Sequence, residues 1–151
     1  MTITTSNYSK VVIIFKNYLH SKNIPFTLER NRIINGWIIW IDKQNNVGIR
    51  IDSLQIYIFH LDGGRLFNIE SQDEILTENE VLAALNHLDL VLFTEFYQET
   101  IYKLGKPCLI RQFIFSNRNK IKISITTLNH WLVLVPLLKK SVITKKYKFS
   151  E

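Results

Sequence analysis

The residues of this chain that could carry chemistry are few, and the first candidates are His60 and Asp62, which lie two positions apart. Residues at that spacing share one face of a strand, where a carboxylate can orient an imidazole as a general base. Both residues come directly before Gly63 and Gly64, and that pair of glycines favours a turn. Because turns leave side chains in solvent, we expect His60 and Asp62 to be solvated and to have no catalytic role.

Other motifs give no stronger indication of catalysis. The segment Asp62-Gly63-Gly64-Arg65 could approach a phosphate, but it lacks the G-x-G-x-x-G spacing and does not open a helix. The four histidines do not lie at metal-ligand spacing. Cys108 is the single cysteine, and its apolar neighbours predict a small buried side chain in a strand. We therefore expect a protein that is not an enzyme and that uses no metal or cofactor.

The charged residues are sorted along the chain, which carries a formal net charge of +6. The segment from Leu66 to Tyr102 holds eight carboxylates and no Lys or Arg. The segment from Thr100 to Ser150 holds eleven cations and no carboxylate. Surfaces of opposite sign select partners of opposite sign, so each segment is a candidate binding face.

The acidic segment predicts a helix that docks on a basic protein. Thr77 and Glu80 form a capping box before an apolar run, and Gly105 with Pro107 gives a stop signal, so the helix is expected over Glu78–Lys103. A solvated helix face would explain the carboxylates equally well, but such a face more often intersperses Lys. The expected partner-binding residues are Asp73, Glu74, Glu78, Glu80, Glu95 and Glu99.

The basic segment supports an alternative, in which the chain binds nucleic acid. Lys residues on strand edges also prevent aggregation, and the segment lacks the interleaved exposed aromatic residues of single-strand binders. A third possibility is that the basic hairpin packs beside the acidic helix and neutralises it. The expected nucleic-acid-binding residues are Lys120, Lys122, Lys145, Lys146 and Lys148.

The elements that must position these residues follow from hydrophobic periodicity. A helix is predicted over Tyr8–Lys22, ended by the segment Asn23–Pro25. A four-stranded antiparallel meander follows, with strands at Arg32–Ile41, Val47–Asp52, Gln55–Leu61 and Arg65–Glu70. After the long helix, a hairpin is predicted from Cys108–Phe115 and Lys120–Thr126, then a strand over Val142–Phe149. The segment Trp131–Leu138 is ambiguous between strand and helix, and its tryptophan is expected in the core.

The predicted fold class is α+β, as one domain over residues 1–151 with a loose arm at 1–6. An antiparallel meander with a hairpin extension carries the N-terminal helix and one long central helix packed on the sheet. No signal peptide and no membrane-spanning run is evident, so we expect a cytoplasmic protein without a membrane partner. The expected core comprises Val11, Phe15, Leu19, Ile39, Ile49, Ile58, Leu85 and Leu92.

Two groups of proteins share gross features with this chain. The order helix, meander, helix, hairpin resembles the topology of type III secretion chaperones, although those are acidic dimers whereas this chain is basic and ends in β-like sequence. The single domain, sorted charge and Ile-, Lys- and Asn-rich composition resemble small bacterial immunity proteins. That resemblance implies a protein that neutralises a cognate toxin, such as a basic nuclease, by covering its active site. The partner and the oligomeric state stay open at this stage.

Overall fold

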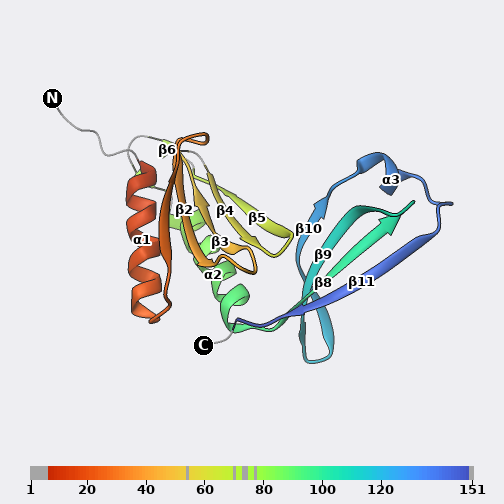
Figure 1. Cartoon of the computed structure of the whole chain (residues 1–151). Coiled ribbons are helices and arrows are strands. Elements are labelled where there is room, and N and C mark those ends of the chain that lie inside the picture. Colours follow the sequence, from red (N-terminus) through yellow and green to blue (C-terminus); the bar gives the residue numbers. More distant parts are fainter. Residues whose placement is uncertain (1–6, 54, 70, 73–74, 77, 150–151) are drawn as a thin grey trace. The chain divides into compact units, whose positions relative to one another are not determined.

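The computed structural model describes residues 7–53, 55–69, 71–72, 75–76 and 78–149 (Figure 1). The chain is mixed helix and sheet, with antiparallel strands in two main sheets. It divides into two compact units, so the prediction of a single domain is not confirmed. The first unit comprises residues 1–61, 65–88 and 151, and the second comprises residues 62–64 and 89–150. The predicted loose arm at 1–6 lies outside the described residues.

The first unit opens with helix α1, Asn7–Ser21, which confirms the predicted N-terminal helix. Its stripe of Val11, Phe15 and Leu19 is fully buried, and the helix contacts strand β3. Asn23 has a positive φ of 56°, and the Ile24 amide donates a hydrogen bond to the Leu19 carbonyl oxygen at 3.0 Å. This is a Schellman ending, in which one left-handed residue closes the helix.

The first sheet is a five-stranded meander in the order β1-β2-β3-β4-β5, one strand more than predicted. The predicted strand Arg32–Ile41 is wrong in its first part, because the backbone amides of Ile33 and Ile34 bond to the Asn31 side chain in a turn. Asn35 completes that turn with a φ of 47°. The strands are β1 Thr27–Asn31, β2 Gly36–Asp42, β3 Val47–Ile51, β4 Gln55–His60 and β5 Gly63–Asn68.

His60 is not solvated as predicted but fully buried at the end of β4. Its Nε2 lies 3.2 Å from the Nε2 of His87, which is also buried. The His87 ring in turn lies 5.7 Å from the Phe67 ring. Burial, and then the nearby Arg65 guanidinium, lower the pKa of His87 from 6.5 to about 4. The His87 imidazole is therefore neutral at physiological pH.

Helix α2 spans Glu78–Phe93, so the predicted helix Glu78–Lys103 is too long by its last third. Its buried face is Val81, Ala84, Leu88, Val91 and Leu92, whereas Leu85, expected in the core, is half-buried. The predicted cap at Thr77 lies outside the described residues, as do Glu70, Asp73 and Glu74. Two short strands precede the helix, β6 Ser71–Gln72 and β7 Ile75–Leu76.

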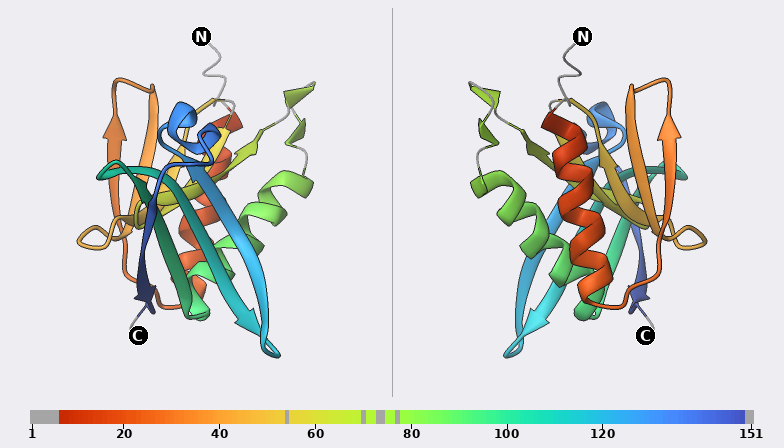
Figure 2. Two further views of the ribbon diagram at one scale, coloured as in Figure 1. Left: turned by 90° about the vertical axis from the view of Figure 1, so that its right-hand side faces the viewer. Right: turned by 90° about the vertical axis from the view of Figure 1, so that its left-hand side faces the viewer.

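The second unit is a four-stranded antiparallel sheet in the order β10-β9-β8-β11 (Figure 2). Leu104 and Gly105 both have positive φ, which makes a two-residue type I′ turn between β8 and β9 rather than a helix stop. Asn117 and Arg118 repeat this turn between β9 and β10, so the predicted hairpin is confirmed. The elements are β8 Phe96–Lys103, β9 Lys106–Ser116, β10 Asn119–Thr127, α3 His130–Leu134 and β11 Lys140–Tyr147.

Candidate interaction surface

Exposed apolar side chains gather on and around the short helix α3 of the second unit. Three of them are mostly exposed to solvent: Trp131 is 57% exposed, Leu134 79% and Leu137 95%. The sequence predicted that Trp131 lies in the core, and this prediction is wrong. Scattered single apolar side chains are ordinary on a protein surface, but a contiguous group marks an interaction site. We call the following set the α3 apolar surface: Trp131, Val133, Leu134, Val135 and Leu137.

One residue of α3 points the other way and attaches the helix to the sheet. Leu132 is fully buried and packs with Ile101 of β8 and Cys108 of β9. The Cys108 thiol bonds to the Ile101 carbonyl oxygen at 3.2 Å, which confirms the prediction of a small buried side chain in a strand. Burial of a leucine side chain contributes about 2 kcal/mol, so this contact fixes which face of α3 is presented outward.

The C-terminal end of α3 is held by a buried ammonium. Lys103 is 9% exposed, and its Nζ donates hydrogen bonds to the carbonyl oxygens of Leu132 at 2.8 Å, Val133 at 3.3 Å and Val135 at 2.9 Å. The last carbonyl groups of a helix have no partner within the helix, so a cation there satisfies them and favours the helix dipole. Lys103 thus fixes the backbone from which Leu134 and Leu137 project.

The N-terminal end of α3 is attached to strand β9. The Asn129 side-chain amide donates a hydrogen bond to the Pro107 carbonyl oxygen at 2.6 Å. The backbone amides of Leu128 and Asn129 both donate to the Cys108 carbonyl oxygen, at 3.0 and 3.3 Å. With both ends anchored, the apolar side chains are presented on a defined backbone, which lowers the entropy cost of docking.

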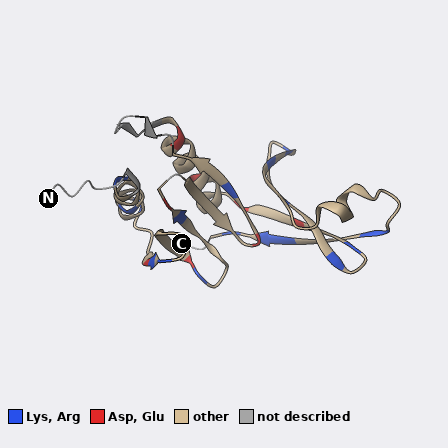
Figure 3. Cartoon of the chain, turned by 90° about the horizontal axis from the view of Figure 1, so that it is seen from above, with Lys and Arg blue, Asp and Glu red and all other residues tan. Residues whose placement is uncertain are grey.

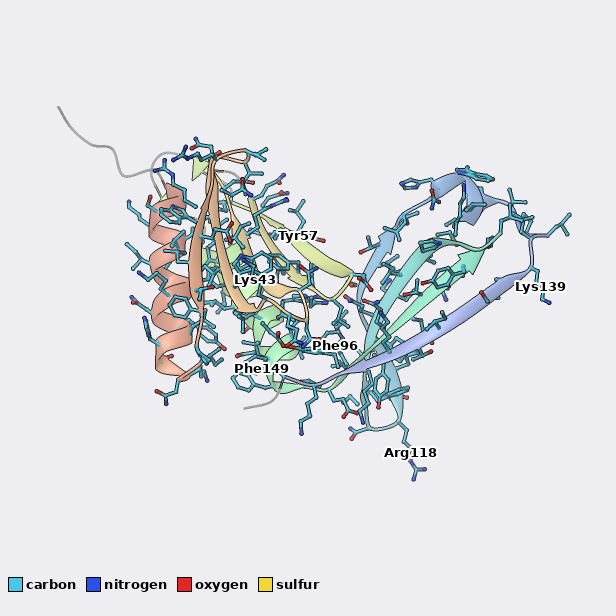
Figure 4. The ribbon with its side chains drawn as sticks, viewed as in Figure 1. Lys43, Tyr57, Phe96, Arg118, Lys139 and Phe149 are labelled. Atoms are coloured by element: carbon cyan, nitrogen blue, oxygen red, sulfur yellow. The ribbon has the colours of Figure 1, made fainter. Side chains whose placement is uncertain are left out.

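Cations border the α3 apolar surface. Lys139 and Lys140 follow it in the chain and are exposed, and Figure 4 labels Lys139 on the connection between α3 and β11. Lys106, also exposed, begins the strand β9 to which the N-terminal end of α3 is bonded. The sequence has no carboxylate between Thr100 and Ser150 to offset them. The surface therefore combines an apolar centre with a basic margin.

The predicted acidic docking face is not one helical surface. The predicted helix would have placed Glu95 and Glu99 one turn apart on one side. Instead, Glu95 comes just before strand β8 and Glu99 lies within it. Glu95 pairs with Lys146 and Glu99 with Lys120, both at 2.9 Å. The sequence left open that the basic hairpin neutralises an acidic helix. Here Lys120 of the hairpin pairs with Glu99 of a strand, and Lys146 of β11 pairs with Glu95, which precedes that strand. Of the others, Glu80 lies half-buried in α2 of the first unit, and the side chain of Glu78 lies outside the described residues.

Four of the predicted basic residues divide between the two faces of the second sheet, and the fifth, Lys148, is exposed just after the end of β11. Lys122 stands opposite Phe113, Phe113 opposite Tyr97, and Tyr97 opposite Lys146, so these four form a row across all four strands. Lys120 lies on the same face, opposite Phe115. Lys145 stands opposite Gln98 and belongs to the other face. Figure 3 shows the basic positions spread along the strands and turns of this unit.

Three aromatic rings lie between these lysines, which sequence reasoning missed. The Tyr97 and Phe113 rings stack with centroids 5.7 Å apart, and Phe115 meets both edge-on. The Lys120 Nζ lies 3.7 Å from the centroid of the Phe113 ring. The available signal was the alternation of Phe113 and Phe115, but Tyr97 could be placed beside them only once Leu104-Gly105 was read as a hairpin turn.

Ion pairing shifts the pKa values of this cluster. The hydrogen bond from Lys146, and then that from the Tyr97 hydroxyl, lower the pKa of the Glu95 carboxyl. The same contacts raise the pKa of Tyr97 and of Lys146. Each group is thereby held in the protonation state that it has at neutral pH, so this end of the face keeps its charges over a wide pH range.

The opposite face of the second sheet carries a buried polar chain beside a pocket. Ser124 donates to Gln112 at 2.6 Å, Gln112 to Gln98 at 2.8 Å, and Gln98 to the Asp62 carboxylate at 2.6 Å. Buried amides satisfied in this way fix the register of the strands. The adjoining pocket has a volume of about 520 Å³ and is lined by Asp62, Thr100, Tyr102, Pro107, Ile110, Leu128, Ile143 and Lys145.

Comparisons with known protein families, curated proteins and solved structures found no match. None of the described helices has the length and apolar character needed to cross a membrane. Within the described part of the chain, no three His, Cys, Asp or Glu side chains gather as metal ligands.

Proposed function

We propose that this protein is a binding module that acts by docking on another protein rather than by catalysis, and that it docks through the α3 apolar surface. The observation that supports this proposal is the exposure of Trp131, Leu134 and Leu137 on a backbone anchored at both ends. An exposed Trp is among the side chains that most often supply the energy of a protein interface. The exposed Leu side chains beside it add apolar area, and the anchored backbone lowers the entropy cost of docking.

The partner has a chemistry that the surface itself indicates. An apolar groove would receive Trp131, Leu134 and Leu137, and carboxylates around it would meet Lys139, Lys140 and Lys106. Docking would then lie away from the acidic residues favoured by the sequence, because Glu95 and Glu99 already have lysine partners. A toxin-neutralising immunity protein is one member of this class, and cytoplasmic inhibition of a toxin stays our prediction for the finer function.

Site-specific crosslinking tests the surface and identifies the partner in the same experiment. A photo-crosslinking amino acid replaces Leu137 in one variant and Ile33 in the other, since both positions are 95% exposed but Ile33 lies in the first unit. We expect Leu137 alone to give a discrete adduct in cells. The adduct is identified by mass spectrometry, and its protein is purified and titrated with the wild-type chain.

The affinities measured in this titration show which surface binds the partner. The double variant Leu134→Ser/Leu137→Ser should weaken the measured affinity at least about ten-fold, as loss of central apolar contacts does, while Ile33→Ser leaves it unchanged. Equal affinity of the double variant would overturn the proposal, and loss on Glu80→Lys instead would restore the acidic face. Adducts only with lipid, or only with a second copy of this chain, would also overturn it.

A further inference from the structure

The row of Lys122, Phe113, Tyr97 and Lys146 suggests a second kind of ligand. Strand spacing places the outer two residues of the row roughly 14 Å apart, with the two aromatic rings between them. Cations at the ends and rings in the middle match a chain that carries regularly spaced negative charges and flat bases. We propose that this face of the second sheet, the aromatic–basic face, binds single-stranded nucleic acid.

The rings are arranged so that some of their surface can receive a base. Phe115 is 53% exposed and Tyr97 is half-buried, whereas Phe113, which stacks with Tyr97, is buried. Stacking on an exposed aromatic ring contributes about 1–3 kcal/mol for each base. Because Phe115 meets the Tyr97 and Phe113 rings edge-on, its orientation is fixed before a ligand arrives.

The charge on the same face favours phosphate. The cations Arg111, Lys120, Lys122 and Lys146 lie there with the carboxylates Glu95 and Glu99, which leaves two positive charges. Arg111 stands opposite Glu99 and is exposed. Arg118 adds a further exposed cation at the tip of the β9–β10 hairpin, where Figure 4 labels it. The sequence argued against nucleic-acid binding because no exposed aromatic residues were found among the lysines. The register of β8, β9 and β10 now places the aromatic side chains beside those lysines.

The ligand must be single-stranded because a base inside a duplex has no free face to stack on Phe115. Bases of every kind have such a face, so the binding is expected to tolerate any sequence. DNA and RNA share this chemistry, and the assay separates them. Helix α3 packs on Ile101, which follows Tyr97 and Glu99 along the same face of β8. The row and the α3 apolar surface nevertheless share no residue, so this inference does not depend on the protein-docking proposal.

Fluorescence anisotropy with the purified full chain tests the inference. The probes are labelled oligonucleotides of about twelve deoxythymidines or uridines, and a blunt duplex of the same length, titrated at several salt concentrations around 100 mM. We expect at least one single strand to bind about ten-fold more tightly than the duplex. Its log affinity should fall with log salt with a slope near −0.7 for each phosphate contact.

Matched variants separate a built site from general attraction. Phe115→Ala should weaken binding about five-fold or more without changing the salt slope, whereas Ile143→Ala, an exposed residue of the opposite face, should have no effect. Lys146→Gln should weaken binding and reduce the slope, while the adjacent Lys145→Gln should not. Equal losses from Lys145→Gln and Lys146→Gln, an unaffected Phe115→Ala variant, or no measurable binding would each overturn the inference.

Discussion

The Nζ of Lys103 donates a hydrogen bond of 2.8 Å to the carbonyl oxygen of Leu132, so a buried cation holds the very residue whose side chain fastens α3 to the sheet. The lysine binds the backbone of Leu132 while the leucine side chain packs on Ile101 and Cys108. The two interactions act at the same point and stabilise one orientation of the helix. This attachment also fixes the position of the exposed residues that follow, up to Leu137.

The first prediction concerns this attachment. Lys103→Met keeps the apolar stem but leaves the carbonyl groups of Leu132, Val133 and Val135 without their donor. We expect a loss of about 2 kcal/mol in the free energy of unfolding, measured by urea denaturation, because unsatisfied buried acceptors are costly. The Val133 amide, which bonds to the Asn129 carbonyl oxygen, should exchange with solvent faster. Lys106→Met, at an exposed position, is the control, and equal effects of the two would refute a specific role for Lys103.

The second prediction corrects the core of α2. Leu88 is fully buried and Leu85 half-buried, although the sequence pattern placed Leu85 in the core. Leu88→Ala should therefore cost about 2–5 kcal/mol of unfolding free energy, and Leu85→Ala clearly less. Chemical denaturation of the two variants side by side measures the difference. A larger cost at Leu85 would mean that the buried face of the helix is assigned wrongly.

The third prediction follows from the lowered pKa of His87. Its pKa is about 4 in the folded chain against 6.5 when exposed, so between these values the unfolded chain binds more protons. Stability should consequently fall as pH drops from about 6.5 towards 4, by about 2 kcal/mol between pH 7 and pH 5. Urea midpoints at the two pH values measure it. His87→Leu should reduce this pH dependence, whereas His20→Leu, at an exposed position, should preserve it.

The fourth prediction concerns the pKa of Tyr97. The hydrogen bond to Glu95 is the first cause of its raised value, so Glu95→Gln should lower the Tyr97 pKa towards its ordinary 10. Nuclear magnetic resonance of the labelled tyrosine ring follows this titration residue by residue. Tyr57 is the comparison, because burial is the main cause of its raised pKa. The Glu95→Gln substitution should therefore leave the pKa of Tyr57 unchanged. An unchanged Tyr97 titration would show that the pair does not persist in solution.

Local sequence signals predicted the fold correctly where each signal is compatible with only one kind of element. The alternation of Val47, Ile49 and Ile51 and the apolar stripe of α1 gave the correct elements. The error came at Gly105, because a left-handed glycine ends a helix and also completes a type I′ hairpin turn. The stretch from Phe96 to Tyr102, rich in aromatic and β-branched residues, favoured the strand, but the stop signal outweighed it.

Long-range pairing could not be predicted in this way. Which lysine meets Glu99, and that Tyr97 stands between Phe113 and Lys146, depend on strand order β10-β9-β8-β11, in which the last strand returns to the edge beside β8. The exposure of Trp131 was equally hidden, because an apolar run of five to eight residues reads alike whether it is buried or presented to a partner.

The last prediction uses Glu99 to separate the acidic and basic hypotheses. Glu99→Gln removes the partner of Lys120 and one negative charge from the aromatic–basic face. If that face binds nucleic acid, affinity for a single strand should rise roughly five-fold, the ~1 kcal/mol that a unit charge at ion-pair distance is worth in water. The salt slope should steepen, because Lys120 becomes free to contact phosphate. Glu80→Gln, in the first unit, is the control and should change neither quantity. If Glu99 instead belonged to a protein-docking face, Glu99→Gln would weaken association with the crosslinked partner and leave nucleic-acid affinity at the level of the control.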